Sequence, residues 1–441
     1  MDVTPLTLLT RRFPSVYPGW FVMAACFTCA MLIIGSTLYV FQLFVLPVTE
    51  EFSISRADAN LAYIALLIGM ALWSPFVGRL LDRVSPHILM PAGAGVFFLT
   101  FALISISPSP VLMLAIIAAF LGLAVATAGG LAANAVTSRW FLKRRGRALG
   151  IVSVASSAGG FAMVPATAAL IEAFGWRTAL FCIGAGVGVI VALVSFFLIK
   201  ARPDEDDMAN FDEFSGIEAS LANATPSEDA AADGAARSST AASDGGLEAK
   251  SWSAGALIKE RNFWLLALGA GLLLASDQAV LTSQYPFFID AGFSASQAAA
   301  IISAMTFSAI GGKLIVGSLA DHIDNRYLFG LVALFHALLL GVYLWQPGFL
   351  FLLVFASIFG AAVGGIYPVW STLTASAFGA ASFGGVFGAM APIMQTLSII
   401  FVRFIGQSYD NTGSYDFAFT AFLGAVVVAF GLIMLMKLPK N

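Results

Sequence analysis

The chain has 441 residues, of which 59% are hydrophobic and only 11% are charged, and its mean hydropathy is +0.90. Soluble globular proteins carry about 25% charged residues, so this composition excludes a water-soluble protein. It indicates a chain that crosses a lipid bilayer many times. We expect membrane lipids as its surroundings and no nucleic-acid partner.

Twelve stretches are apolar over the length of about 20 residues that a membrane-spanning helix needs. In chain order they are 20–46, 59–78, 88–107, 111–137, 148–172, 177–199, 262–288, 297–318, 327–346, 349–376, 385–408 and 416–437. A helix satisfies every backbone hydrogen bond within its own segment, as lipid requires. The predicted fold class is therefore an all-α integral membrane protein with twelve transmembrane helices.

The basic residues indicate the orientation of these spans. With the N-terminus placed in the cytoplasm, all but four of the 22 Lys and Arg residues lie on the inner side or in the central loop. The exceptions are Arg56 and Arg177 on the outer side and Lys313 and Arg403 within spans. This bias follows the positive-inside rule. We expect both termini in the cytoplasm and a location in the plasma membrane, which is the inner membrane in a bacterium.

The central stretch 200–258 differs from the rest of the chain. It is rich in Ala, Ser, Asp and Gly and has few large apolar residues. Such a segment buries too little apolar surface to fold alone. It is predicted to be a disordered acidic cytoplasmic linker between an N-terminal six-helix half (1–199) and a C-terminal six-helix half (259–441).

The two halves share a motif at the inner end of their second span. GRLLDRVSPH begins at Gly78 and GSLADHIDNR begins at Gly317, so each has Gly, three residues and then Asp. Parallel six-span repeats describe the major facilitator fold, and the motif resembles that superfamily's loop signature. Glycine lets two helices approach closely. The resemblance implies a role in switching between inward-facing and outward-facing states for Gly78, Asp82, Arg83, Gly317 and Asp321, although His322 takes the basic position of the second copy.

Three further stretches resemble the monocarboxylate porter family of that superfamily. They are YPGWFVM from Tyr17, RWFLKRRGRALGIVSVASSAGG from Arg139 and FGWRTALF from Phe174. The resemblance implies a secondary active transporter of a small organic anion, in the first place a monocarboxylate. Symport with a proton is the expected coupling, because it offsets the anion's charge against an inside-negative potential.

Other functions are weighed against this interpretation. The fourth span, GLAVATAGGLAAN, lacks the Arg of many proton-coupled sugar and drug transporters, and the fifth has only a loose form of the antiporter glycine signature. A proton-coupled drug or cation antiporter is the main alternative, and a receptor that binds without transport is another. No nucleophile–base set, metal-ligand cluster or phosphate loop is found, so we expect no enzyme, no metal and no cofactor.

Lys313 is the first candidate for the substrate site. It precedes Asp321 by eight residues, which is about 12 Å along a helix and near the middle of a hydrocarbon core about 30 Å thick. A charge there costs about 2.5–3.5 kcal/mol, so it should face a cavity or a partner, unless it snorkels to the interface. Porters of this family carry an Arg at the matching position, which implies that Lys313 binds the substrate carboxylate.

Two more charges lie within spans. Asp277 is well inside the seventh span and is either the proton site, the ion-pair partner of Lys313 or a protonated structural carboxyl. The acid that animal porters carry one turn before Lys313 is Ala309 here, and their first-span Lys has no counterpart in GSTLYVFQLF, so their coupling scheme does not transfer intact. Arg403 is a second anchor for a dicarboxylate substrate, an outer gate element or a snorkelling residue.

Uncharged polar residues on apolar spans complete the candidates. Small-molecule sites are mostly apolar with a few placed polar groups, although such residues also serve as hydrogen-bonding contacts between helices. The candidates are Tyr39, Gln42, Asn134, Gln284, Tyr285 and Tyr367. His336 is expected to be a hydrogen-bonded packing residue. The identity of the substrate, the direction of transport and the oligomeric state are left open.

Overall fold

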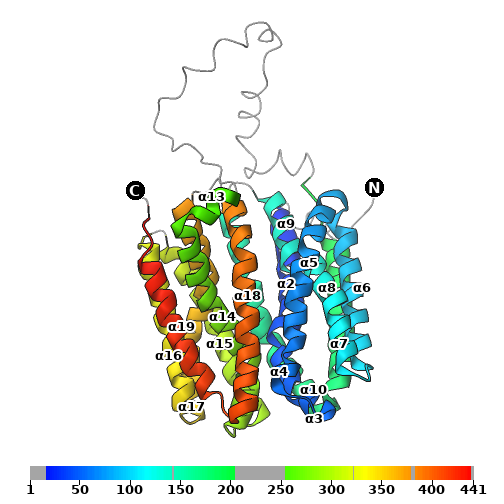
Figure 1. Cartoon of the computed structure of the whole chain (residues 1–441). Coiled ribbons are helices and arrows are strands. Elements are labelled where there is room, and N and C mark those ends of the chain that lie inside the picture. Colours follow the sequence, from blue (N-terminus) through cyan, green and yellow to red (C-terminus); the bar gives the residue numbers. More distant parts are fainter. Residues whose placement is uncertain (1–15, 142–143, 204–253, 321, 379–382, 439–441) are drawn as a thin grey trace, which may run out of the picture.

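The computed structural model describes residues 16–141, 144–203, 254–320, 322–378 and 383–438. Its helices form two upright bundles that stand side by side (Figure 1). The first bundle contains α2 (Gly19–Ile34), a π-helical turn η1 (Gly35–Tyr39), α3 (Phe41–Phe52), α4 (Arg56–Ala59), α5 (Leu61–Arg83), α6 (Pro86–Ser105), α7 (Pro110–Ile116), a second π-helical turn η2 (Ile117–Leu121), α8 (Gly122–Ala128), α9 (Gly130–Trp140) and α10 (Arg145–Leu198). The second contains α13 (Ala254–Lys259), α14 (Arg261–Asp290), α15 (Ala295–Leu319), α16 (Asn325–Trp345), α17 (Phe349–Phe378), α18 (Phe383–Thr412) and α19 (Asp416–Met434).

The helices confirm the predicted all-α membrane fold. Within the described ranges, 11 helical segments are long and apolar enough to cross a membrane. One of them, in the 54-residue α10, bends at Gly175, whose φ of 76° suits a residue without a Cβ atom. This helix therefore contains the predicted span 148–172 and all but the last residue of 177–199, and each of the twelve predicted stretches is helical over most of its length.

Side chains in the short connections define where several helices begin. The hydroxyl of Ser294 accepts from the Gln297 backbone while the Gln297 side chain bonds back to Ser294, which is a complete capping box. Ser109 caps α7 just before Pro110, a residue suited to the first helical turn. Asp324 caps α16 through the backbone N–H of Arg326. These caps satisfy backbone donors that a helix start leaves unpaired.

Glycines determine how closely the helices pack within each bundle. A Cβ atom on Gly159 of α10 would lie 2.2 Å from the Met31 carbonyl oxygen of α2. In the second bundle, a Cβ on Gly312 of α15 would lie 2.0 Å from the Ala361 carbonyl of α17. Helices in lipid associate through small residues of this kind, since lipid tails remove the hydrophobic drive between them.

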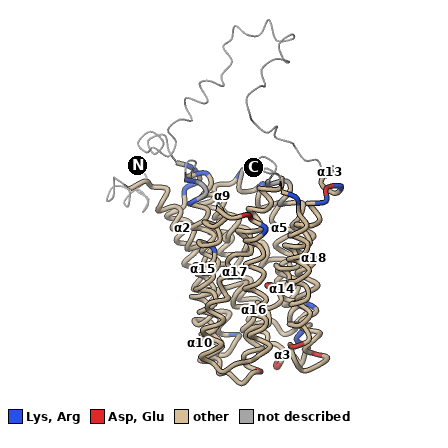
Figure 2. The backbone as a smooth tube through the Cα atoms, turned by 90° about the vertical axis from the view of Figure 1, so that its left-hand side faces the viewer, with Lys and Arg blue, Asp and Glu red and all other residues tan. Residues whose placement is uncertain are grey.

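The two ends of the molecule differ in charge. Lys and Arg gather at the end where α5 and α15 finish, and we call this the basic end (Figure 2). Asp and Glu residues lie at the opposite end, where α3, α14 and α18 finish, and we call this the acidic end. Its acids include Glu51, Asp290 and Asp410.

The predicted linker, 200–258, falls mostly outside the described residues. Only its borders belong to them, and residues 254–258 are part of α13. The division of the chain at this segment stays a prediction. The two bundles in Figure 1 match the two predicted halves in their order along the chain.

Candidate functional site: a central cavity and a closed gate

A cavity of about 1400 Å³ lies between the bundles. The first bundle lines it with α2, η1, α9 and the start of α10, and the second bundle lines it with α14, α15 and α17. Its lining runs out to Arg147 near the start of α10 and to Ser371 toward the end of α17. Both residues lie toward the basic end, so the cavity opens there.

Five of the predicted substrate and proton residues line this cavity together. They are Tyr39, Asn134, Asp277, Lys313 and Tyr367. The rest of the wall is mainly apolar, with residues such as Leu38, Leu131, Leu281 and Val363. A large apolar pocket with a few convergent polar groups is the usual form of a small-molecule site.

The Lys313 ammonium reaches from the second bundle to the first. Its Nζ donates to the Ser153 backbone oxygen at 2.8 Å and to the Ser156 hydroxyl at 2.5 Å, both on α10. The neighbouring Gly312 packs against Ala361 of α17. Successive helical residues are about 100° apart, so this packing turns Lys313 away from α17 and toward the cavity. The ammonium is held between the bundles by neutral oxygens.

Asp277 lies on α14 and faces the same cavity. Among the described residues, its carboxylate has no hydrogen bond and no ion pair within 4 Å. It still interacts electrostatically with Lys313 and with the hydroxyl groups of Tyr39 and Tyr367. Lys313 and Asp277 therefore face the same cavity near each other without direct contact.

His336 contacts the residue next to Asp277. It is fully buried on α16, and its Nε2 lies 2.9 Å from the hydroxyl of Ser276, the residue before Asp277. The contact fastens α14 to α16 next to the acidic group. The position agrees with the expected packing role.

Three predicted residues form a layer beyond the cavity instead of lining it. Gln42 is buried, donates to the Tyr39 carbonyl at 3.0 Å and accepts from the Tyr285 backbone N–H at 3.0 Å. Gln284 donates weakly to the sulfur of Met305 at 3.5 Å. These contacts join α14 to the first bundle and to α15, and they seal the cavity on the side of the acidic end.

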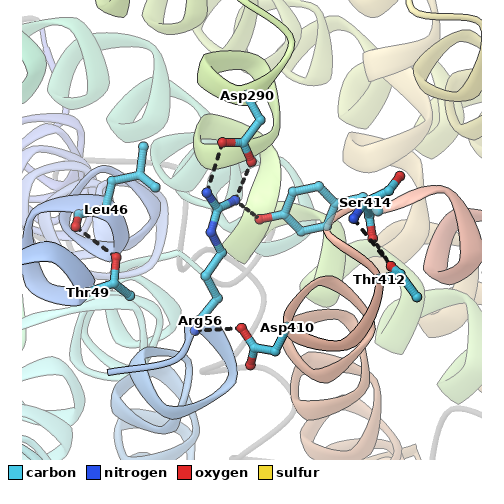
Figure 3. A network of polar contacts seen from close by, with 8 residues as sticks. Leu46, Thr49, Arg56, Asp290, Asp410, Thr412 and Ser414 are labelled. Carbon is cyan, nitrogen blue, oxygen red and sulfur yellow. Dashed lines mark hydrogen bonds and ion pairs between the residues drawn. The ribbon is translucent and has the colours of Figure 1, made fainter. Parts of the chain in front are cut away.

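A second polar cluster closes the acidic end (Figure 3). The Arg56 guanidinium is bonded by both terminal nitrogens to Asp290, with Nη2 to Oδ1 at 2.9 Å, and it donates to the Tyr415 hydroxyl at 2.6 Å. It also lies 3.7 Å from the centre of the Tyr409 ring, which adds a cation–π contact. Arg56 of the first bundle thus contacts both α14 and the junction of α18 and α19 in the second bundle.

The backbone at Arg56 is bound as well. Its N–H and that of Ala57 each donate to a carboxylate oxygen of Asp410 at 3.0 Å, as acids do at helix N-termini. Arg403 lies in this cluster and not in the cavity wall, with Nη1 3.0 Å from Asp58. We call Arg56, Asp58, Asp290, Arg403 and Asp410 the gate.

The loop motif shows a different arrangement from the one its glycines predict. Of the residues that the structure describes, none has an atom within 4 Å of a Cβ atom built on Gly78 or on Gly317. Arg83 is exposed at the end of α5, while Asp321 and the side chain of Asp82 lie outside what the structure describes. Within the described residues, no close helix approach is found at these two glycines, and the cavity opens at the same end.

Several residues of the site were missed by the sequence reasoning. Ser153 and Ser156 belong to the small-residue run SVASSAGG, where their spacing gives no hint of a charged partner. Gln278 lines the cavity and bonds to the Tyr63 hydroxyl. Arg56 had a weak signal, since it is a rare cation on the side that the other basic residues avoid.

Two helical bundles around a central cavity, open at one end and bound together at the other, define a secondary transporter. The chain matches the family model described as Major Facilitator Superfamily over residues 21–403, and it belongs to that family. It is a membrane transporter and not an enzyme.

Individual relatives are distant. The chain is 28% identical over 186 residues to an uncharacterized MFS-type transporter of Bacillus subtilis, a match that covers 42% of this chain and 45% of that protein. It is 27% identical to monocarboxylate transporter 12 of Rattus norvegicus, over 73% of this chain and 67% of that one. It is 26% identical to monocarboxylate transporter 11 of Homo sapiens, over 99% and 87%. The resemblance to monocarboxylate porters is thereby confirmed as distant similarity.

The fold is that of solved transporters. A bacterial homologue of the human lysosomal transporter Spinster, in an inward-facing and unoccupied conformation, superposes with a TM-score of 0.67 at 16% identity over 95% of this chain and 96% of that one. The inward-facing and occupied form of such a homologue gives 0.64 at 15% identity, with the same coverage. At this identity the likeness confirms the fold.

Proposed function

We propose that this protein moves a small organic anion, a monocarboxylate, across the plasma membrane in symport with a proton. The observation that carries the proposal is the Lys313 ammonium, which lies in the cavity against neutral oxygens of α10. Within the described residues it has no carboxylate within 4 Å. An anionic substrate would bring a negative charge into direct contact with the ammonium, and hydrogen bonds between charged groups are stronger than those between neutral groups.

The charge distribution supports an orientation with the basic end in the cytoplasm. The cavity then faces inward, and the gate at the acidic end faces outward. Arg403 and Arg56 act in this proposal as outer gate residues. In the opposite conformation the gate opens, the basic end closes, and Gly78 and Gly317 become the points at which helices approach.

Asp277 is the proposed proton site. One elementary charge moved through a membrane potential of 100 mV is worth about 2.3 kcal/mol, so an anion entering alone opposes an inside-negative potential. A proton carried with the anion removes this cost. The carboxylate on α14 lies in electrostatic range of Lys313 but forms no direct ion pair among the described residues, which supports Asp277 as the group that carries the proton.

The same carboxylate favours a second candidate function. A transporter of drugs or other organic cations needs an acid in its cavity, and Asp277 is such an acid. In that case the substrate binds to Asp277, and Lys313 competes with it. The two candidates differ in the charge of the ligand that the cavity prefers.

Ligand binding to the purified transporter separates them. Thermal unfolding is followed with monocarboxylates, amines and sugars for the wild type and for Lys313→Gln, with the exposed Lys259→Gln as the matched control. We expect carboxylates to raise the melting temperature of the wild type and of the control, since a ligand of the native state stabilises it. Lys313→Gln should lose that shift. Stabilisation by amines alone, or an undiminished shift in Lys313→Gln, overturns the anion proposal.

A further inference from the structure

Lysine alone is an imperfect carboxylate anchor. Arginine presents a rigid pair of donors that match the two oxygens of a carboxylate, whereas the lysine ammonium is a point charge on a flexible stem. A site that depends on Lys313 therefore lacks orientation unless a neighbour adds a second donor. The contacts of Lys313 identify one such neighbour.

We propose that Ser156 is a specificity-determining residue of this transporter, and that its hydroxyl completes a two-donor carboxylate site with Lys313. The inference rests on the proposed function and goes further by naming the second donor. It also assigns the two donors to different bundles. The Ser156 oxygen lies 2.5 Å from Nζ, so the donors stand side by side.

The hydroxyl can change its role when the substrate arrives. Without a ligand, its oxygen accepts from Lys313 and its hydrogen points back to the Ser153 carbonyl at 3.1 Å. A hydroxyl hydrogen rotates to suit its partners, so it can turn from that carbonyl to a carboxylate oxygen. Lys313 keeps its contact with the Ser153 carbonyl and offers a further N–H to the other oxygen.

Access and surroundings fit this role. Ser153, Ser156 and Lys313 all line the cavity that opens at the basic end. Ser156 is half-buried, which limits competition from bulk water, and the wall beside it is apolar. The proposed ligand is a monocarboxylate whose charged end lies between α10 and α15 and whose body lies along the apolar wall.

A consequence concerns the transport cycle. Because Ser156 belongs to the first bundle and Lys313 to the second, a carboxylate is bound by both donors only while α10 and α15 are in contact at this level. The substrate therefore bridges the two halves that move relative to each other. Removing the Ser156 hydroxyl should weaken carboxylate binding, because one of the two donors is lost, without disturbing the packing of either bundle.

Substitutions on α10 provide the test, with Ser153 as the matched control. The Ser153 side chain donates to the Gly150 carbonyl, and Lys313 touches only the Ser153 backbone, so Ser153→Ala leaves the contact in place. Binding of propionate, pyruvate and benzoate, each compared with its carboxamide, is measured by calorimetry on the purified full chain. Proteoliposome uptake gives KM and kcat separately.

We expect Ser156→Ala to weaken carboxylate binding roughly tenfold to a hundredfold, the effect of losing a hydrogen bond to a charged group. The KM should rise with little change in kcat, and the preference for carboxylates over carboxamides should shrink. Ser156→Thr should restore the KM and this preference. Ser153→Ala should stay within about twofold of the wild type. In a Lys313→Arg background, Ser156→Ala should weaken binding less, because arginine brings its own pair of donors.

Four results overturn the inference. If Ser156→Ala binds carboxylates as the wild type does while Lys313→Gln has lost binding, the anion proposal stands and this inference alone fails. Equal losses in Ser153→Ala and Ser156→Ala indicate a general effect of α10 polarity and also defeat it. An undiminished effect of Ser156→Ala in the Lys313→Arg background contradicts the two-donor geometry. If no carboxylate binds the wild type, the proposed function falls together with the inference.

Discussion

Arg56 and Asp290 join the two bundles of this transporter at the acidic end, through a guanidinium bonded by both terminal nitrogens to one carboxylate. The pair is only partly exposed, with relative side-chain exposures of 12% and 31%, and it is braced by Tyr409 and Tyr415. Fully exposed ion pairs contribute little to stability. This one is bidentate, stacked on a ring and shared between the two bundles, so in the proposed cycle we expect it to favour the conformation that is closed at the acidic end.

Asp290→Asn should therefore shift the protein toward the conformation that is open at the acidic end. A loss of about 1.4 kcal/mol changes the ratio of two conformers tenfold. We expect a cysteine placed at Ala59, which is buried beside the gate, to react at least several-fold faster with a membrane-impermeant thiol reagent. Unchanged labelling contradicts the gate. Asp416→Asn, which changes an acid at the same end outside the gate, is the control.

Gly312 and Gly311 make a matched pair for the packing of α15. A methyl group on Gly312 would meet the Ala361 backbone, whereas no described atom lies within 4 Å of a Cβ built on Gly311. Gly312→Ala should destabilise the protein by about 1–3 kcal/mol, as overpacking does, and should misplace Lys313. Gly311→Ala should be tolerated. Thermal unfolding of both variants, with carboxylate binding as the second readout, checks this expectation; equal behaviour of the pair argues against it.

Asp277→Asn tests the proton site without removing the anion site. The variant keeps the shape of the side chain but cannot cycle a proton. Uptake driven by an imposed pH gradient should fall to near background in proteoliposomes. Exchange of labelled for unlabelled carboxylate, which needs no net proton movement, should persist. If Asp277→Asn takes up carboxylate at the wild-type rate under the pH gradient, a group other than Asp277 couples transport to the proton.

Gly317 tests the proposed closure of the basic end. No described atom lies within 4 Å of a Cβ built on Gly317, and the residue lines the open cavity, so we expect a leucine side chain to be accommodated there. It should obstruct the helix approach proposed for the other conformation. We expect Gly317→Leu to retain the melting temperature within a few degrees and to lose most transport. A variant that transports normally shows that Gly317 does not meet another helix during the cycle.

The predicted substrate and proton residues lie in three places, the cavity wall, the layer beyond it and the gate, for a physical reason. Counting along a helix gives depth in the membrane, and depth was sufficient to mark Lys313 and Asp277 as unusual charges. It does not give the direction in which a side chain points. Arg403 has a plausible depth for a binding site, yet α18 turns it toward Asp58 in the gate.

The sequence by itself determined the class of molecule. Apolar stretches of about 20 residues must be helices in lipid, because no water is present to satisfy the backbone. The asymmetry of Lys and Arg indicates an orientation, and the repeated Gly-to-Asp motif pairs the two halves. These properties are local in the chain and need no knowledge of which helices touch.

Only the tertiary structure decided which polar groups share a space. The rotation of α15 about its axis depends on the contact between Gly312 and Ala361, two residues that are 49 positions apart in the chain. The partnership of Lys313 with Ser156 joins helices of different bundles. Such contacts depend on how two helix surfaces fit, and serine, alanine and glycine in an apolar run carry too little chemical character to predict it.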